Sequence, residues 1–330
     1  MLRRIIALGL LSGALVSIAT APARAQGQFP ERPITLICPL PAGGGVDIAM
    51  RGLAQEMQAI LGQPVLVESR AGASGTIAGS YVAQAKPDGY AVGLFQSPQA
   101  IPEVYSDFLK PPYTSEQIRP VARYMSLVFG MPSRPDAPWK TIGQLVEYIK
   151  ANPGKVRWGH TIGVGHPLHL LTYSLLKKHD LKVIEVPFKG AADAITALLG
   201  GHIDVAFGAS VTATAGHAAA GRLSILAIHN PARLESMPDV PTFTEQGLDP
   251  GVMPVYNTFF VPRGTPDAVV AKLHDAIKKA IETPTLIEYA RKNGFELYYG
   301  SESDVLTELK RDREVTASLI EAMQKDKPAR

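Results

Sequence analysis

Strand-like and helix-like runs alternate along most of this 330-residue chain. In the first part, apolar runs cover Ile34–Cys38, Val65–Glu68 and Ala91–Phe95, and helical patterns at Asp47–Leu61 and Thr76–Ala85 lie between them. A βαβαβ pattern of this kind folds into parallel strands joined by right-handed crossovers. The alternation therefore predicts an α/β fold built on parallel sheets.

A second series of strands and helices follows a proline-rich break that ends at Arg119-Pro120. Its expected strands are Val121–Phe129, Arg157–His160, Val183–Phe188, Ile203–Phe207, Leu223–Ile228 and then Asn257–Val261. Its expected helices are Thr141–Asn152, His166–His179, Ala191–Leu199 and Ala213–Ala220, followed by Pro266–Thr283, Thr285–Asn293 and Ser303–Met323. We expect one lobe at 26–122, a second at 123–250, and a return to the first at 251–330. Two crossings between lobes predict a cleft, and ligands in open α/β sheets bind beyond the carboxyl ends of the strands.

The N-terminal residues have the pattern of a targeting segment. Arg3 and Arg4 precede an apolar run, Ile5–Ile18, and Ala23-Arg24-Ala25 has the form of a signal-peptidase site. The apolar run is shorter than the roughly 20 residues of a membrane-spanning helix. We expect a signal peptide at 1–25, cleaved after Ala25, and export to the periplasm.

Charge and cysteine content narrow the functional classes. The chain has 33 Lys+Arg and 30 Asp+Glu, and residues 1–25 hold three arginines and no acid, so the mature chain has no net charge. That balance argues against a nucleic-acid partner and against long-range steering of an anion. Cys38 is the single cysteine, so no intramolecular disulfide forms, and we expect its thiol to be buried in a strand.

A glycine-rich turn, Pro39–Asp47, joins the first strand to the first helix. The first N–H groups of a helix have no intrahelical partner, and the helix dipole adds partial positive charge there. Glycine removes side chains that would keep a ligand away. No Gly-Lys-Ser/Thr follows, so the turn is not a nucleotide P-loop. It predicts a small anion held by backbone groups of this turn.

Five further loops that follow strands are rich in Gly, Ser, Thr or Gln and carry few charges. A hydrogen bond to a charged group contributes about 1.5–3 kcal/mol. Several such bonds allow the roughly −8 kcal/mol of micromolar binding without an arginine. Lys189 could supply one positive charge. The expected ligand-binding residues in these loops are Ser74, Gly75, Thr76, Gln96, Ser97, Gly163, Val164, Gly165, His166, Lys189, Gly190, Ala191, Ala209 and Ser210.

The sequence contains no constellation that indicates catalysis. There is no G-x-S-x-G elbow, and Ser74, Ser97 and Ser210 have no histidine or acid at a spacing that implies a base. We therefore expect neither an enzyme nor a cofactor. His160, His166 and His169 could form a zinc site, but no acidic ligand is near them in sequence. We expect His166 to face the cleft and His169 to pack within its helix, with no bound metal.

Seven segments together resemble the extracytoplasmic solute-binding proteins of tripartite tricarboxylate transporters, the Bug family. They are Pro30–Ile34, Pro41–Asp47, Leu61–Ala73, Ala85–Tyr90, Val186–Gly190, Leu199–Val205 and Pro238–Gly247. The resemblance extends over essentially the whole mature chain. It implies a two-lobe, type II periplasmic-binding-protein fold that closes on a carboxylate and delivers it to a membrane permease.

The resemblance also implies which residues contact the ligand. The first glycine loop at Ala42, Gly43 and Gly44 would lie on one side of the ligand. On the other side the resemblance implies Gly163, Gly165, His166, Lys189, Gly190 and Ala191. Two positions depart from the family pattern, since the family often has Ser at His166 and Glu at Tyr173. The departure at His166 suggests a different ligand headgroup.

The sequence as a whole predicts a monomeric periplasmic receptor for a di- or tricarboxylate or an aromatic acid. Its partners would be that organic acid and integral-membrane transporter subunits. An exported serine hydrolase, a metal-binding protein and a ligand-sensing subunit for a histidine kinase are the alternatives. The sequence does not specify which carboxylate is bound.

Overall fold

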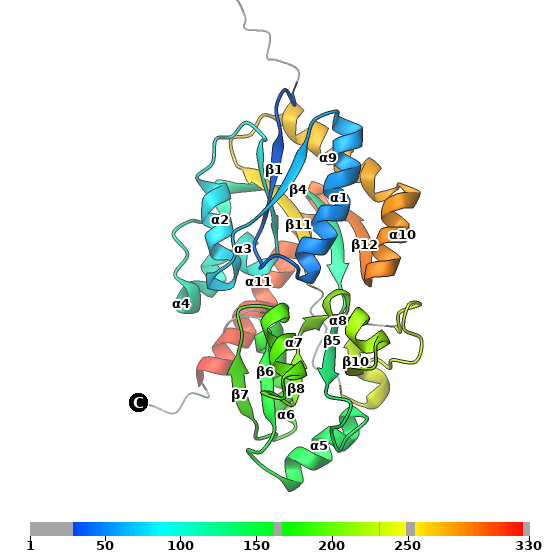
Figure 1. Cartoon of the computed structure of the whole chain (residues 1–330). Helices are drawn as coiled ribbons and strands as arrows, with labels where there is room; N and C mark the ends of the chain where they lie inside the picture. Colours follow the sequence, from blue (N-terminus) through cyan, green and yellow to red (C-terminus); the bar gives the residue numbers. More distant parts are fainter. Residues whose placement is uncertain (1–28, 162–166, 231, 249–254, 326–330) are drawn as a thin grey trace, which may run out of the picture.

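Two mixed sheets form the centres of two lobes in the computed structural model, which describes residues 29–161, 167–230, 232–248 and 255–325 (Figure 1). The sheet of lobe 1 has the strand order β12-β4-β11-β3-β1-β2. These strands are β12 Phe295–Gly300, β4 Ile118–Leu127, β11 Tyr256–Pro262, β3 Ala91–Phe95, β1 Ile34–Cys38 and β2 Val65–Ser69. Strand β1 runs parallel to β2 and β3, whereas β11 is antiparallel to both β3 and β4.

The sheet of lobe 2 has the order β10-β5-β8-β6-β7, and β9 pairs with β5 beside this path. Its strands are β10 Ser224–His229, β5 Phe129–Ser133, β8 Val205–Phe207, β6 Arg157–His160, β7 Ile184–Pro187 and β9 Ala209–Ser210. Strand β6 is parallel to β7 and β8, and β5 is antiparallel to its neighbours. The expected parallel pairs are therefore confirmed, but each sheet is completed by antiparallel strands.

Helices surround both sheets. The longer ones are α1 Gly45–Leu61, α2 Thr76–Ala83, α5 Ile142–Ala151, α6 Pro167–Lys178, α7 Ala191–Leu199, α8 Val211–Ala219, α9 Asp267–Ile281, α10 Pro284–Asn293 and α11 Glu302–Lys325. Short helical turns are η1 Ala73–Gly75, α3 Ser97–Ala100, η2 Pro102–Tyr105, α4 Ser106–Leu109, η3 Ser115–Gln117 and η4 Thr244–Gln246. No helix among the described residues is both long and apolar enough to cross a membrane.

Local signals in the sequence explain several helix ends. Thr141 caps α5 as expected, because its side chain accepts a hydrogen bond from the Gln144 N–H. Gly62 ends α1 with φ 68°, and Gly294 ends α10 with φ 67°. These left-handed conformations place little strain on glycine, so both helices stop where the sequence indicates.

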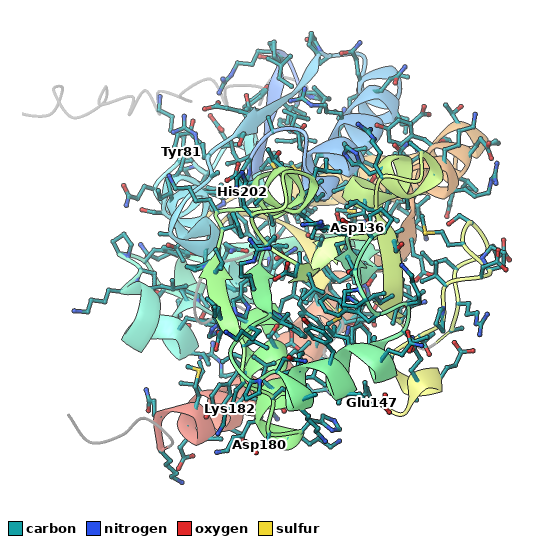
Figure 2. All side chains as sticks on the ribbon, turned by 60° about the horizontal axis from the view of Figure 1, so that its bottom comes forward. Tyr81, Asp136, Glu147, Asp180, Lys182 and His202 are labelled. Carbon is teal, nitrogen blue, oxygen red and sulfur yellow. The ribbon has the colours of Figure 1, made fainter. Side chains whose placement is uncertain are left out.

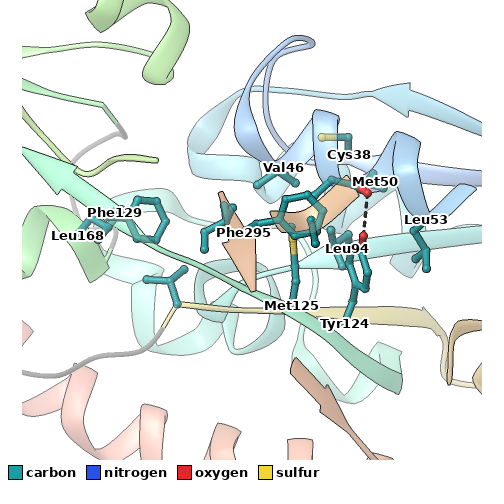
Figure 3. Packing of buried hydrophobic residues seen from close by; sticks show 14 of the residues in the cluster. Cys38, Val46, Met50, Leu53, Leu94, Tyr124, Met125, Phe129, Leu168 and Phe295 are labelled. Carbon is teal, nitrogen blue, oxygen red and sulfur yellow. Dashed lines mark hydrogen bonds between the residues drawn. The ribbon is translucent and has the colours of Figure 1, made fainter. Parts of the chain in front are cut away.

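The largest core cluster extends through both lobes, and its lobe 1 part lies between α1, the sheet and helices α9 and α10. Tyr124 is fully buried there among Met50, Leu94, Met125 and Phe295, and its hydroxyl donates to the Ala49 carbonyl at 2.9 Å (Figure 3). This bond ties β4 to α1 and satisfies the one polar atom that burial would otherwise penalise. The helix that begins at the glycine turn is thus held rigidly on its sheet.

Cys38 is buried at the end of β1, as predicted. Burial raises the pKa of its thiol to about 12, because the thiolate would lose its hydration. The thiol is therefore protonated at neutral pH and chemically inert.

The chain crosses between lobes between β4 and β5, at Val128, rather than near residue 122. The run expected to be one strand, Val121–Phe129, is divided, with β4 in the first sheet and β5 in the second. The chain re-enters the first sheet with β11. Helix α11 adds a further connection, because it contacts β4 of lobe 1 and α6 of lobe 2 (Figure 1).

Candidate functional site

A pocket lies between the two lobes, at the carboxyl ends of β1, β6 and β8. It contains about 410 Å³ of space between the atoms, part of which is open to solvent. The lining residues are Leu40, Pro41, Gly44, Gly45, Val46, Leu127, Phe129, Thr161, Gly190, Ala191, Ala192, Gly208 and Ser210. None of these described lining residues has a charged side chain, so they can meet the charge of a ligand only through dipoles and hydrogen bonds.

Three helix N-termini meet at this pocket. Helix α1 begins at Gly45, α7 begins at Ala191, and α8 follows its N-cap Ser210. The first intrahelical bond of α1 is from the Ile48 N–H to the Gly44 carbonyl, and that of α7 is from the Ala194 N–H to the Gly190 carbonyl. The N–H groups that precede these bonds belong to the helix ends. Aligned peptide dipoles make such ends favourable for an anion.

The glycine turn itself is arranged by Asp47, which is buried in the first turn of α1. One of its carboxylate oxygens accepts the Gly43 N–H at 3.0 Å, and Arg51 donates to both oxygens at 2.9 and 3.0 Å. Gly43 has φ 78°, which favours glycine. Its N–H is thus used to hold the turn, and neither Ala42 nor Gly43 lines the pocket, whereas Gly44, Gly45 and Val46 do.

The two lobes touch beside the pocket. A Cβ added to Gly45 would overlap the Ser210 hydroxyl oxygen and lie 3.2 Å from the Thr212 Cβ. A Cβ on Gly190 would lie 3.2 Å from the Pro41 Cγ. The Thr212 hydroxyl also donates to the Gly294 carbonyl at 3.2 Å. Glycine at positions 45 and 190 therefore permits this close approach of the lobes.

The loops after β2 and β3 do not contribute to the pocket lining. Gln99 donates to the Ser74 carbonyl, and the Thr76 hydroxyl donates to the Ala73 carbonyl at 2.8 Å. Gly75 has φ 86° and packs against Gln99. These groups have partners within lobe 1, so the structure does not place Ser74, Gly75 or Thr76 in the pocket between the lobes.

Gln96 and Ser97 lie in a separate small cavity beneath α11. The Gln96 amide donates to the Asn257 side chain at 3.0 Å, and the Ser97 hydroxyl donates to Asp312 at 2.7 Å. Burial raises the pKa of Asp312, although Ser97 and Arg311 oppose this effect. No histidine is among the described lining residues of this cavity, but the structure brings the acid Asp312 to Ser97, a neighbour that sequence spacing did not indicate.

The remaining expected residues fall into three groups. Gly190, Ala191 and Ser210 line the pocket, whereas Ala209 is fully buried in β9 and the Lys189 side chain is exposed. Gly163, Val164, Gly165 and His166 lie outside the described residues. Sequence reasoning missed Leu127 and Phe129, because an apolar lining residue has the same pattern as a core residue.

A cluster of two imidazoles and one carboxylate lies next to Thr161. The His160 Nε2 is 2.7 Å from the Glu185 Oε2, and the rings of His160 and His169 are 5.2 Å apart in an edge-to-face arrangement. Sequence spacing predicted no acid near these histidines. That prediction was wrong, because parallel pairing of β6 with β7 brings Glu185 beside His160.

Tyr173, the second departure from the family pattern, is partly buried against a core cluster. It packs with Ile101, Tyr105, Leu170 and Ile320 between α6, η2 and α11. A charged residue at this position would be placed among apolar side chains. The tyrosine therefore belongs to the contact between α6 and α11.

Two α/β lobes with an uncharged, amide-lined pocket between them define a periplasmic-binding-protein fold. Residues 49–324 match the tripartite tricarboxylate transporter family receptor, and the chain belongs to this family. The family consists of solute-binding receptors that perform no catalysis, which agrees with the expectation that the chain is not an enzyme.

Individual relatives agree with this assignment. A UPF0065 protein of Bordetella pertussis is 34% identical over 308 residues, which cover 93% of this chain and 92% of that protein. The structure of the periplasmic binding protein BugD has a TM-score of 0.82 and 29% identity, and covers 89% of this chain and 98% of BugD. MatC from Rhodopseudomonas palustris with bound malate has a TM-score of 0.80 and 25% identity, covering 88% and 100% of the two chains.

Proposed function

We propose that this receptor captures a small di- or tricarboxylate or an aromatic acid in the pocket between its lobes. The convergence of three helix N-termini on a pocket without charged lining side chains is the observation that carries the proposal. Each N-terminus supplies N–H donors and partial positive charge to a carboxylate. Two carboxylates at opposite sides of the pocket would use donors from both lobes.

The apolar part of the lining fits the carbon skeleton of such an acid. Val46, Leu127 and Phe129 line the pocket beside the helix ends. The malate bound to MatC, a relative at 25% identity, supports a dicarboxylate as the first compound to test. Residues Gly44, Gly45, Gly190, Ala191 and Ser210 are the proposed contacts, and Gly163, Val164, Gly165 and His166 remain further proposed contacts from the sequence.

Capture of the acid would couple to lobe closure. The contacts of Gly45 with Ser210 and of Gly190 with Pro41 exist only when the lobes meet. A ligand that bridges the helix ends of both lobes binds this closed form better and shifts the population toward it. We propose that the closed form is delivered to integral-membrane transporter subunits.

Export is part of the same proposal. Residues 1–25 would act as a signal peptide cleaved after Ala25, which releases the mature receptor into the periplasm. N-terminal sequencing of protein recovered from a periplasmic extract should begin at Gln26. A mature protein that retains Met1 would contradict this step.

A thermal-shift screen tests the ligand class. Purified protein is heated with malate and other mono-, di- and tricarboxylates, aromatic acids and amino acids. An acid at 100 times its Kd should stabilise the protein by about 2.7 kcal/mol. The Gly45→Ala variant is the control, because its lobes cannot close fully. If no carboxylate shifts the Tm, or if the native protein and the variant shift equally, the proposal fails.

A further inference from the structure

Two histidines and a glutamate from three different elements meet in lobe 2, at the carboxyl end of β6. His160 ends the internal strand β6, Glu185 lies in the edge strand β7, and His169 lies in the first turns of α6. One ligand atom from each residue lies within 4.8 Å of the other two. None of the three side chains is among the lining residues of the pocket between the lobes. The receptor function therefore does not account for this cluster.

The strand register brings the first two side chains to one face of the sheet. Trp158 pairs with Glu185 and His160 pairs with Pro187 in the parallel β6–β7 ladder. Because side chains alternate along a strand, Glu185 and His160 point to the same face. Helix α6 covers that face and brings His169 over the ring of His160. The arrangement is fixed by secondary structure.

The distances are close to those of a metal centre. Around Zn²⁺, nitrogen ligands lie about 2.0–2.1 Å and carboxylate oxygens about 2.0–2.2 Å from the metal. Ligand atoms in a tetrahedral set are then about 3.3 Å from one another. The His160 Nε2 and Glu185 Oε2 are 2.7 Å apart, and all three ligand atoms lie within 4.8 Å of one another. Side-chain rotation can supply the remaining adjustment toward a common metal position.

Burial and exposure also suit an ion. The His160 side chain is 5% exposed, whereas that of Glu185 is 49% exposed. The carboxylate on an edge strand leaves a path from solvent, and the buried imidazole supplies a fixed ligand. Two imidazoles and one carboxylate are a donor set typical of zinc with water in a fourth position.

We propose that His160, His169 and Glu185 bind a divalent transition-metal ion, with Zn²⁺ the best fit to the donor set. The ion would bind one imidazole nitrogen of each histidine and a carboxylate oxygen of Glu185, in place of the present His160–Glu185 hydrogen bond. Because Thr161 follows His160 and lines the pocket, the ion would fix the start of the loop between β6 and α6.

Isothermal titration of tag-free, EDTA-treated and dialysed protein with ZnCl₂ tests the proposal in the absence of any organic acid. We expect a saturable heat with one ion bound per chain. His169→Ala and Glu185→Gln should each weaken zinc binding by at least about tenfold, because each removes one of three ligands. Co²⁺ in place of zinc should give the visible absorption of a tetrahedral site.

His202→Ala is the matched control. His202 is exposed in the turn that precedes the amino end of β8 (labelled in Figure 2), whereas His160 lies at the carboxyl end of the neighbouring strand β6. This variant should bind zinc like the native protein. Circular dichroism confirms that each variant is folded, and Glu185→Gln retains a hydrogen-bond acceptor for His160. No zinc heat in the native protein, or equal affinity in all variants, overturns the proposal.

The zinc titration and the test of the receptor function can be interpreted separately. Carboxylate binding measured in EDTA tests the proposed receptor, and zinc binding without carboxylate tests this cluster. A protein that binds the acid but not zinc removes only the metal site. A protein that binds zinc but no acid removes only the proposed ligand class.

Discussion

The loops that follow β1, β7 and β8 differ from those that follow β2 and β3, although both groups are rich in small and polar residues. The first group, which includes Gly44, Gly190 and Gly208, lines the pocket between the lobes. In the second group, Ser74, Gln96 and Ser97 bond to neighbouring parts of the protein. Composition alone does not distinguish the two groups.

The difference depends on what lies opposite each loop. Helix α11 and strand β11 face the loop after β3 and provide Asp312 and Asn257 as partners. Across from the loop after β1 lie the helix ends of the other lobe, which are themselves donors. N–H groups of one lobe that face N–H groups of the other lobe find no acceptor in each other, so they remain available to an anion. Donor groups that face an acceptor within the protein form a hydrogen bond that stabilises the fold.

The largest expected effect is that of Gly45→Ala on ligand affinity. The added Cβ would overlap the Ser210 oxygen across the cleft and oppose closure. Overpacking of this kind costs about 1–3 kcal/mol, which corresponds to roughly 5- to 150-fold weaker binding. Titration calorimetry with the best acid from the screen measures this loss. The Tm of the unliganded variant should not fall, because the lobes can separate. If the variant binds the acid as tightly as the native protein does, glycine at position 45 is not needed for closure.

Ser97→Ala should lower the stability of the protein and leave its ligand affinity unchanged, the reverse of the Gly45→Ala effect. It removes the 2.7 Å bond to Asp312 and leaves a buried carboxyl group without its donor. We expect a loss of about 1–2 kcal/mol in unfolding free energy and a Tm lower by a few degrees. Chemical denaturation measures the first quantity and calorimetry the second. Ligand affinity should be unchanged. A loss of affinity would show that Ser97 belongs to the binding site after all.

Gly190→Ala should weaken binding less than Gly45→Ala. Its added Cβ would lie 3.2 Å from the Pro41 Cγ, a tight contact that a small shift relieves. We expect a cost of up to about 1 kcal/mol, or roughly two- to fivefold in Kd. The same titration compares the two variants directly. An equal or larger loss for Gly190→Ala would reverse the assignment of the tighter contact.

The smallest effect is that of Asp312→Asn, and it should depend on pH. Burial raises the pKa of Asp312 above its ordinary value, so the folded state binds a proton that the unfolded state releases. This contribution to stability is present at about pH 4 and is lost as pH rises through the folded pKa. The neutral Asn avoids that loss. The Tm of the variant relative to that of the native protein should therefore be higher at pH 7.5 than at pH 4. An equal Tm difference at both pH values would contradict the raised pKa of Asp312.

Much of the fold followed from periodicity and turn residues. Strands β1 and β3 and helix α7 begin and end at the predicted residues, because apolar runs bounded by glycine or proline specify them locally. Strand β12 was not predicted, since its residues Phe295–Gly300 form a strand only through pairing with β4. The division between β4 and β5 at Val128 was also missed, because both halves are equally apolar and the crossing depends on tertiary pairing.

Less of the site could be predicted. The glycine turn indicated the correct helix end, but the capture of the Gly43 N–H by Asp47 moved the lining toward Gly44, Gly45 and Val46. The orientation of the Asp47 side chain decides which N–H groups line the pocket, and sequence spacing does not predict that orientation. Glu185 was separated from His169 by 16 positions, and only the pairing of β6 with β7 brings them together.

Helix α11 limits how the lobes can separate. Its N-terminal half lies along β4, and near its C-terminus Ile320 and Met323 pack in one cluster with Leu170 of α6. A rigid rod anchored at both ends stays close to the axis of any rotation that leaves its contacts intact. We therefore expect the mouth to widen on the side away from this rod, so that solutes enter and leave from one direction only.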